Sequence, residues 1–257
     1  MRKRAKLSPA SESGFSVKPK GAAGCVVVIH EVWGLVGHTK DVCKRVGKLG
    51  FAAVAPNLYS GHHELLTPDN IQKAMEGVWE LSLDERRDAA KVAQALDKKK
   101  AGDDVRKVVS IIYDPAFRDK LLEDTLATVE RTRSKFENVA TLGFCIGGGL
   151  SLKCATRTNT IKSAISFYGQ PPPTDDVTKI SIPILAIHAN YDEIINKSVP
   201  AFVGAMLDGG KDLTLKTYPQ TKHGFFNDSR NEVYDRKSAE GAWEVTRWFL
   251  EKTLTGN

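Results

Sequence analysis

Short runs of consecutive apolar residues, many of them β-branched, recur along this chain and predict buried β-strands. Val26-Val27-Val28-Ile29 is typical, because it lacks polar alternation. Both faces of such a strand should be covered, as they are in a parallel sheet. By this pattern we expect strands at residues 24–30, 51–56, 138–144, 161–168, 182–188 and 213–218.

Between these runs, apolar residues recur at intervals of three and four, which predicts amphipathic helices. Thr39 and Asp84 are the expected N-caps of the first and third helices. Residues 107–113 fit either a strand or a buried helical segment. Strands that alternate with helices predict an α/β fold with a doubly wound, mostly parallel sheet flanked by helices. The predicted helices are residues 39–49, 68–80, 84–98, 121–136, 147–156 and 232–252.

Charge is distributed unevenly along the 257 residues. The net charge is +6, but residues 1–20 hold +5 of it, so the rest of the chain is close to neutral. We interpret residues 1–17 as a basic, weakly ordered tail and residues 18–257 as a single domain, an ordinary size for an α/β fold. We expect no nucleic-acid partner. Binding through residues 1–20 is the alternative, and deleting them tests it.

The chain shows neither the pattern of a secretory signal nor that of a membrane span. Met1-Arg-Lys-Arg is followed by the polar stretch Ser8-Pro-Ala-Ser instead of an apolar run. Apolar runs stay well short of the roughly 20 residues that a membrane helix needs. We therefore expect a soluble, cytoplasmic protein without a membrane partner. Both a monomer and a homodimer fit the sequence.

The four cysteines lack C-x-x-C spacing, so we expect free thiols without a zinc site or a disulfide framework. His62 and His63 are adjacent in a predicted loop, which is not the spacing of metal ligands. We expect no metal and no organic cofactor. The cysteines are Cys25, Cys43, Cys145 and Cys154.

Cys145 stands in the sequence Gly143-Phe-Cys-Ile-Gly147, a G-x-S-x-G pattern with cysteine in place of serine. It follows a predicted strand and precedes a predicted helix, the context that a nucleophile elbow requires. Glycines two residues away leave room where strand and helix approach each other. A helix N-terminus beside the sulfur would favour the thiolate. The alternative is a buried structural cysteine beside a glycine-rich turn.

Two further residues occupy the positions that the acid and the base of a triad would need. Asp192 follows the predicted strand 182–188, and His223 follows the predicted strand 213–218. Sites in open α/β sheets form at these carboxyl ends, in the chain order nucleophile, acid, histidine. His223 would accept the proton of Cys145, and Asp192 would orient the imidazole. A turn aspartate and a solvated loop histidine are the alternatives.

An acyl-transfer site also needs donors for the oxyanion that forms on the substrate. The backbone N–H of Ile146, directly after the nucleophile, is the first candidate. The second should come from the loop after the first buried strand, at Val32 or Trp33.

These segments together resemble the dienelactone hydrolase (carboxymethylenebutenolidase) family of the α/β-hydrolase superfamily. The resemblance covers about residues 18–252 and rests on Val28–Gly34, Gly143–Gly149, Asp192 and His223–Asp228. It implies a carboxylic ester hydrolase that cleaves a small ester or lactone through a thioester intermediate.

The resemblance also implies a catalytic role for Glu31. In the family the matching glutamate is tied to the nucleophile and helps to deprotonate it when substrate binds. Such an arrangement protects an idle thiol from oxidation. A carboxylate that completes a salt bridge at the strand end is the alternative.

One stretch departs from the family pattern. Characterised members hold the substrate carboxylate with arginines, one of them shortly after the catalytic histidine, but Gly224–Asp228 contains no arginine. Arg230, Arg86 and Arg87 are the substitutes that the sequence offers. A bidentate clamp for the substrate carboxylate is therefore unsupported. Without it, dienelactone itself is not supported as the substrate, but hydrolysis of an ester or lactone is still expected.

Aromatic residues near these segments are candidates for the walls of a substrate pocket, with ordinary core packing as the alternative for each. They are Trp33, Tyr59, Trp79, Tyr168, Phe225 and Phe226.

Two other functions fit the same residues. One is a general thiol carboxylesterase, which assays of p-nitrophenyl esters beside a dienelactone would distinguish. The other is a non-catalytic binding protein that kept the fold. Rapid, pH-dependent alkylation of Cys145 that is lost in His223→Ala would favour an enzyme.

Overall fold

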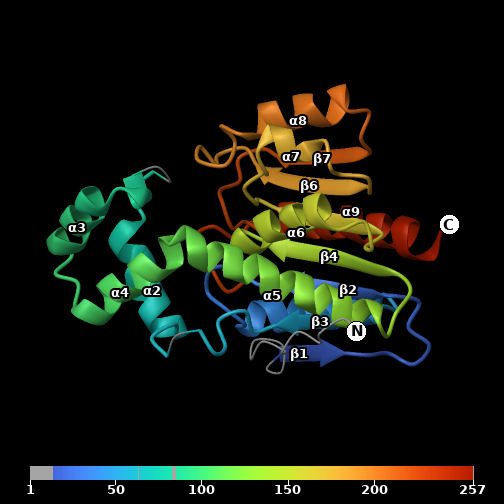
Figure 1. Cartoon of the computed structure of the whole chain (residues 1–257), viewed down its shortest axis with the longest axis horizontal. Helices are drawn as coiled ribbons and strands as arrows, with labels where there is room; N and C mark the ends of the chain where they lie inside the picture. Colours follow the sequence, from blue (N-terminus) through green and yellow to red (C-terminus); the bar gives the residue numbers. More distant parts are fainter. Residues whose placement is uncertain (1–13, 63, 83–84, 257) are drawn as a thin grey trace, which may run out of the picture.

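The computed structural model describes residues 14–62, 64–82 and 85–256, and its centre is a seven-stranded sheet (Figure 1). The strand order is β1-β3-β2-β4-β5-β6-β7, and every neighbouring pair is parallel except β1 and β3. The predicted mostly parallel sheet is therefore confirmed. The strands are β1 Gly14–Val17, β2 Cys25–Ile29, β3 Ala52–Pro56, β4 Val139–Phe144, β5 Ser163–Phe167, β6 Ile184–Ala189 and β7 Leu213–Tyr218.

Helices cover both faces of the sheet, which is why the central strands carry no polar alternation. In β2, Val27 and Ile29 pack in one core cluster, and Val26 and Val28 pack in the other. The first cluster lies under α5 (Pro115–Arg133), α6 (Ile146–Arg157) and α8 (Val199–Asp208). The second lies under α1 (Gly37–Lys48) and α9 (Arg236–Thr255). Every residue of β2, β4, β5 and β6 is buried.

A group of three helices between β3 and α5 extends beyond the end of the sheet. Figure 1 shows it at the left, on the side toward which the arrowheads of β4 and β6 point. We call α2–α4 the helical extension; it consists of α2 (Pro68–Val78), α3 (Ala89–Lys98) and α4 (Asp103–Tyr113). Its apolar residues, such as Ile71 and Val108, join the first core cluster. The extension therefore lies beside the carboxyl ends of the strands, where the candidate residues are.

Several boundaries differ from the sequence prediction. Residues 107–113 are the second half of α4, because Val105, Val108, Val109 and Ile112 form one helical face. Helix α1 begins at Gly37 after the N-cap Val36, so Thr39 is a buried residue of the first turn and not the cap.

Helix α3 and the N-terminal strand also differ. The Asp88 side chain caps α3 by accepting from the N–H groups of Ala90 and Lys91, and the predicted cap Asp84 lies outside the described residues. Gly14–Val17, which we assigned to the tail, form β1 at the edge of the sheet. The short α7 (Thr174–Val177) and α8 were not predicted.

Candidate active site

Cys145 lies in a strained turn between β4 and α6. Its backbone has φ 55° and ψ −118°, a conformation that side-chain-bearing residues rarely adopt. A Cβ on Gly143 would lie 1.9 Å from the Gly147 carbonyl oxygen, and one on Gly147 would lie 2.4 Å from the Ile29 carbonyl oxygen. Both glycines are therefore required by space, and the turn presents the partly exposed Cys145 at the end of the strand.

His223 and Asp192 meet at the adjacent strand ends. Their Nδ1 and Oδ2 atoms are 2.6 Å apart, and the Asp192 Oδ1 accepts a hydrogen bond of 3.2 Å from the Ile195 N–H. Asp192 is buried, and the His223 side chain is 24% exposed, so the imidazole has one side open for a reactant. The carboxylate is thus fixed by the backbone and in turn fixes the ring.

The electrostatics of His223 connect it to Cys145. Burial by itself lowers the pKa of His223. The charge of Cys145, together with hydrogen bonding to Asp192 and to Cys145, outweighs burial and holds that pKa well above its usual range. The imidazole therefore favours the protonated form when the sulfur is a thiolate.

Glu31 is buried in the same region, and both of its carboxylate oxygens are engaged. Oε1 accepts a hydrogen bond of 3.1 Å from the Tyr168 hydroxyl, and Oε2 accepts one of 2.6 Å from the Asn227 amide. Burial and the charge of Glu31 raise the pKa of Tyr168 well above its usual range, so the phenol stays a neutral donor. In this structure the bonding partners of Glu31 are therefore Tyr168 and Asn227.

The N–H groups of Val32 and Ile146 are candidates for binding an oxyanion. Within the part of the chain that the structure describes, neither donates a hydrogen bond to a protein acceptor. The loop that carries Val32 is held by the Tyr59 hydroxyl, which donates a hydrogen bond of 2.9 Å to the Val32 carbonyl. Both N–H groups are therefore unpaired among the described residues.

Four of the predicted pocket aromatics are buried, and the other two, Trp33 and Trp79, line a cavity. Phe225 has no exposed surface and packs between Tyr168 and Tyr218, which favours ordinary core packing, the alternative for this residue. Tyr59 and Tyr168 are also buried, and they orient Val32 and Glu31 through their hydroxyls. Trp33 is partly exposed and lines a cavity.

Of the three arginines considered as carboxylate binders, Arg230 packs against the loop that carries His223. A Cβ on Gly224 would be 3.3 Å from Arg230 Nη1, and the Arg230 charge acts on Tyr168. Its Nε and Nη2 bind Glu232 Oε1 at 2.8 and 2.6 Å. Arg86 donates to the carbonyls of Leu81 and Trp79. The Arg87 side chain lies outside the described residues.

Sequence reasoning missed Asn227 and the partner role of Tyr168. Asn227 belongs to the segment that carried the family resemblance, but no pattern in one sequence connects it to a residue 196 positions away. His62 pairs with the buried Asp124, Nε2 to Oδ2 2.7 Å, and His63 is outside the described residues. The described residues contain no group of three or more side chains suited to a metal ion. None of the described helices is long and apolar enough to cross a membrane.

A mostly parallel sheet with helices on both faces, a strained cysteine turn after β4, and an aspartate and a histidine after β6 and β7 define the class: this is an α/β-hydrolase fold. The chain belongs to the dienelactone hydrolase family, whose sequence profile matches residues 13–254. It is a dienelactone hydrolase-like hydrolase.

Known proteins support this assignment over nearly the whole chain. A protein of Saccharolobus solfataricus, provisionally named a carboxymethylenebutenolidase, is 34% identical over 93% of this chain and 93% of its own length. The Anabaena variabilis dienelactone hydrolase structure covers 93% of this chain and 91% of its own at 18% identity, with a TM-score of 0.54. A dienelactone hydrolase-like promiscuous phosphotriesterase from metagenomic libraries covers 93% and 92% at 19% identity, with a TM-score of 0.66. At these identities the two structures support the fold alone.

Proposed function

We propose that this protein hydrolyses a small ester or lactone with Cys145 as nucleophile, His223 as base and Asp192 as the residue that orients the base. The observation that carries the proposal is the His223–Asp192 contact of 2.6 Å, combined with the effect of Cys145 on the pKa of His223. An aspartate-held histidine beside a strained, partly exposed cysteine is the arrangement that nucleophilic acyl transfer needs.

The first half-reaction forms a thioester. The Cys145 sulfur, having given its proton to His223, attacks the carbonyl carbon, and the N–H groups of Ile146 and Val32 stabilise the oxyanion. When the tetrahedral intermediate collapses, the carbon–oxygen ester bond breaks. His223 gives its proton to the departing alcohol, and a lactone keeps that hydroxyl on the acyl chain.

The second half-reaction releases the acid. His223 takes a proton from water, the hydroxide attacks the thioester carbonyl, and the carbon–sulfur bond breaks. The carboxylic acid leaves, and the proton on His223 restores the thiol–imidazole pair. Asp192 stabilises the imidazolium in both halves. These steps use side chains, backbone donors and water alone.

Glu31 has a positioning role in this proposal. Its carboxylate, fixed by Tyr168 and Asn227, sits next to Val32 in sequence, so it anchors the loop that supplies the second oxyanion donor. The family resemblance adds that Glu31 approaches the thiol when substrate binds. For that step a Glu31 oxygen has to approach Cys145 from its present hydrogen bonds with Tyr168 and Asn227.

Replacing Cys145 by alanine tests the proposal. We expect hydrolysis of p-nitrophenyl esters and of lactones to fall to background in Cys145→Ala, with unchanged thermal unfolding. Cys154→Ala is the matched control, because Cys154 is fully buried in α6, nine positions after Cys145. Full turnover in Cys145→Ala would refute the mechanism, and a screen of esters beside a dienelactone would define the substrate range.

A further inference from the structure

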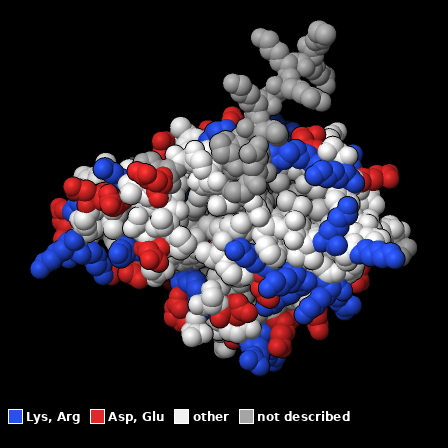
Figure 2. All heavy atoms as spheres, turned by 90° about the horizontal axis from the view of Figure 1, so that it is seen from below, with Lys and Arg blue, Asp and Glu red and all other residues white. Residues whose placement is uncertain are grey.

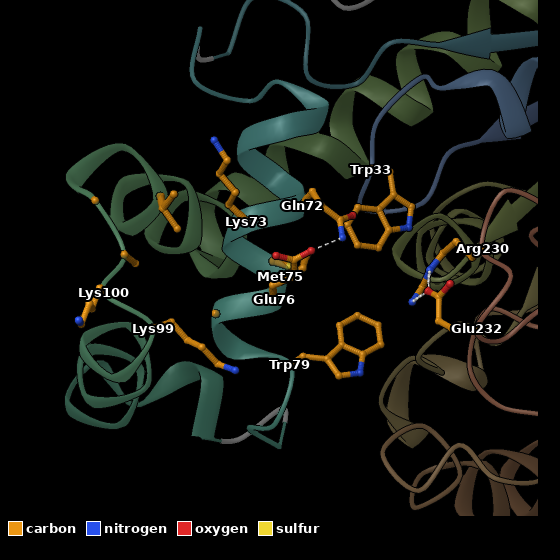
Figure 3. Close-up of a pocket in the computed structure, with 14 residues that line it drawn as sticks. Trp33, Gln72, Lys73, Met75, Glu76, Trp79, Lys99, Lys100, Arg230 and Glu232 are labelled. Carbon is orange, nitrogen blue, oxygen red and sulfur yellow. Dashed lines mark hydrogen bonds and ion pairs between the residues drawn. The ribbon is translucent and has the colours of Figure 1, made fainter.

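A cavity of about 860 Å³ lies between the helical extension and the loops of the candidate site (Figure 3). Trp33 and Arg230 line it from the loops that also carry Glu31 and His223, and Trp79 lines it from the end of α2. Cys145 and His223 are not among the lining residues. The cavity therefore adjoins the candidate site without including the reacting sulfur.

Two indole rings face the cavity, that of Trp33 from the loop of the candidate site and that of Trp79 from the end of α2. The guanidinium carbon of Arg230 lies 5.3 Å from the centroid of the Trp33 ring and 5.1 Å from that of Trp79. Trp79 nevertheless remains 44% exposed. Figure 3 shows both rings projecting into the same space, with Arg230 beside them. Because the guanidinium already lies against both rings, a planar ligand has the remaining exposed surface of Trp79 to stack on.

The charge of the cavity decides what kind of planar ligand fits. Its lining includes four cationic side chains but only two carboxylates. Glu232 is paired with Arg230, and Glu76 keeps its charge while it accepts a hydrogen bond of 2.6 Å from Gln72, so four cations and two carboxylates leave the lining with a net charge of +2. In Figure 3 the Lys99 ammonium group points toward Trp79, and its ion pair with Glu80 is long at 3.7 Å and exposed. An anionic group is therefore favoured at the Lys99 end.

The position of Trp33 connects this cavity to the chemistry. Trp33 directly follows Val32, whose N–H is a free donor, so their Cα atoms are about 3.8 Å apart. A ring bound in this cavity is therefore close to a carbonyl bound at the Val32 N–H.

The cationic lining of the cavity differs from the surface around it. On the face drawn in Figure 2, the helical extension at the left carries interspersed basic and acidic side chains.

We propose that this cavity binds the leaving group of the substrate, and that this group is a planar aromatic ring with an anionic substituent. The ring stacks on the exposed part of Trp79, and the anion pairs with Lys99. The proposal rests on the ester hydrolysis proposed above, because it assigns the substrate class of that same site.

Binding to an inactive protein tests the cavity separately from the chemistry. The probe is 2-naphthoate, followed by tryptophan fluorescence in Cys145→Ala. We expect Trp79→Ala in that background to weaken binding about tenfold through lost stacking and burial. Lys99→Gln should weaken 2-naphthoate about threefold and leave the neutral 2-naphthamide unchanged. Trp248 and Lys252 on α9 are the matched controls, because Trp248 is 47% exposed with the Lys252 ammonium 5.4 Å from its ring.

Two results would overturn the proposal: equal affinities of the Trp79→Ala and Trp248→Ala proteins, or equal binding of naphthoate and naphthamide. With active protein, Trp79→Ala should raise KM for 6-carboxy-2-naphthyl acetate, and the control Trp248→Ala should leave that KM unchanged. An unchanged KM, with ester hydrolysis intact, would overturn the cavity assignment alone. Naphthoate binding that depends on Trp79 in a protein without esterase activity would refute the proposed function and not the cavity.

Discussion

The side-chain amide of Asn227 donates a hydrogen bond of 2.6 Å to the carboxylate of Glu31, across 196 positions of sequence. Both residues are buried, and this bond joins the loop after β2 to the loop after β7. Together with the Tyr168 hydroxyl, the amide satisfies a carboxylate that would otherwise be buried without donors.

Asn227→Ala should destabilise the protein, because it leaves one Glu31 oxygen buried and unpaired. We expect a loss of about 1–3 kcal/mol in the free energy of unfolding, measured by urea denaturation. Asn159→Ala is the control, since Asn159 is exposed between α6 and β5. A loss no larger than that of the control would show that the Asn227–Glu31 bond contributes nothing to stability.

The raised pKa of His223 predicts an alkaline limit to acylation. The leaving alcohol needs a proton from the imidazolium, so the single-turnover acylation rate should fall as pH rises through the pKa of His223. The hydrogen bond with Asp192 is one cause of the raised pKa. Asp192→Asn removes that carboxylate, lowers the pKa and should move the alkaline fall to lower pH.

Rapid-quench measurement of alcohol release from an alkyl ester, whose alkoxide needs a proton in order to leave, checks this prediction across the pH range. Asp176→Asn is the control, because Asp176 is a partly exposed carboxylate paired with Lys179 and not with His223. If Asp192→Asn and the control share one alkaline limb, Asp192 does not set the protonation of His223.

The turn at Cys145 should tolerate no side chain at Gly143. A Cβ there would lie 1.9 Å from the Gly147 carbonyl oxygen, which is backbone and cannot rotate away. We expect Gly143→Ala to lose about 3 kcal/mol of stability. Gly204→Ala is the control: a Cβ at Gly204 meets nothing within 4 Å, so this change in α8 should stabilise the helix by about 0.5–1 kcal/mol. Similar unfolding curves for both variants would refute the steric argument.

Much of the sheet was predictable because its signal is local. β2, β4 and β6 are apolar runs buried on both faces, and a run of that kind has few other structures open to it. Residues 107–113 were ambiguous since a run of seven residues fits both periods, and the preceding turn of α4 settles it as helix. Strand β1 escaped prediction because it has only four residues and none of them is buried, so it forms no apolar run.

The candidate site was also predictable only in part. Chain order and strand ends were enough to single out Asp192 and His223, and the structure brings them to 2.6 Å. The hydrogen bonds that Tyr168 and Asn227 make to Glu31 join segments far apart in sequence, so only the folded chain reveals them. Trp79 was a candidate for the pocket wall, but the sequence did not show that it meets Trp33 and Arg230 in one cavity.

Mass spectrometry of the protein and of its peptides, after rapid acid quenching with a p-nitrophenyl ester, shows whether Cys145 carries the acyl group. We expect the intact mass to increase by one acyl group, and the peptide that contains Cys145 to carry it. The increase should be lost on treatment with hydroxylamine and absent from Cys145→Ala. Acyl groups on another residue, or turnover that continues without any adduct at Cys145, would contradict this role of Cys145.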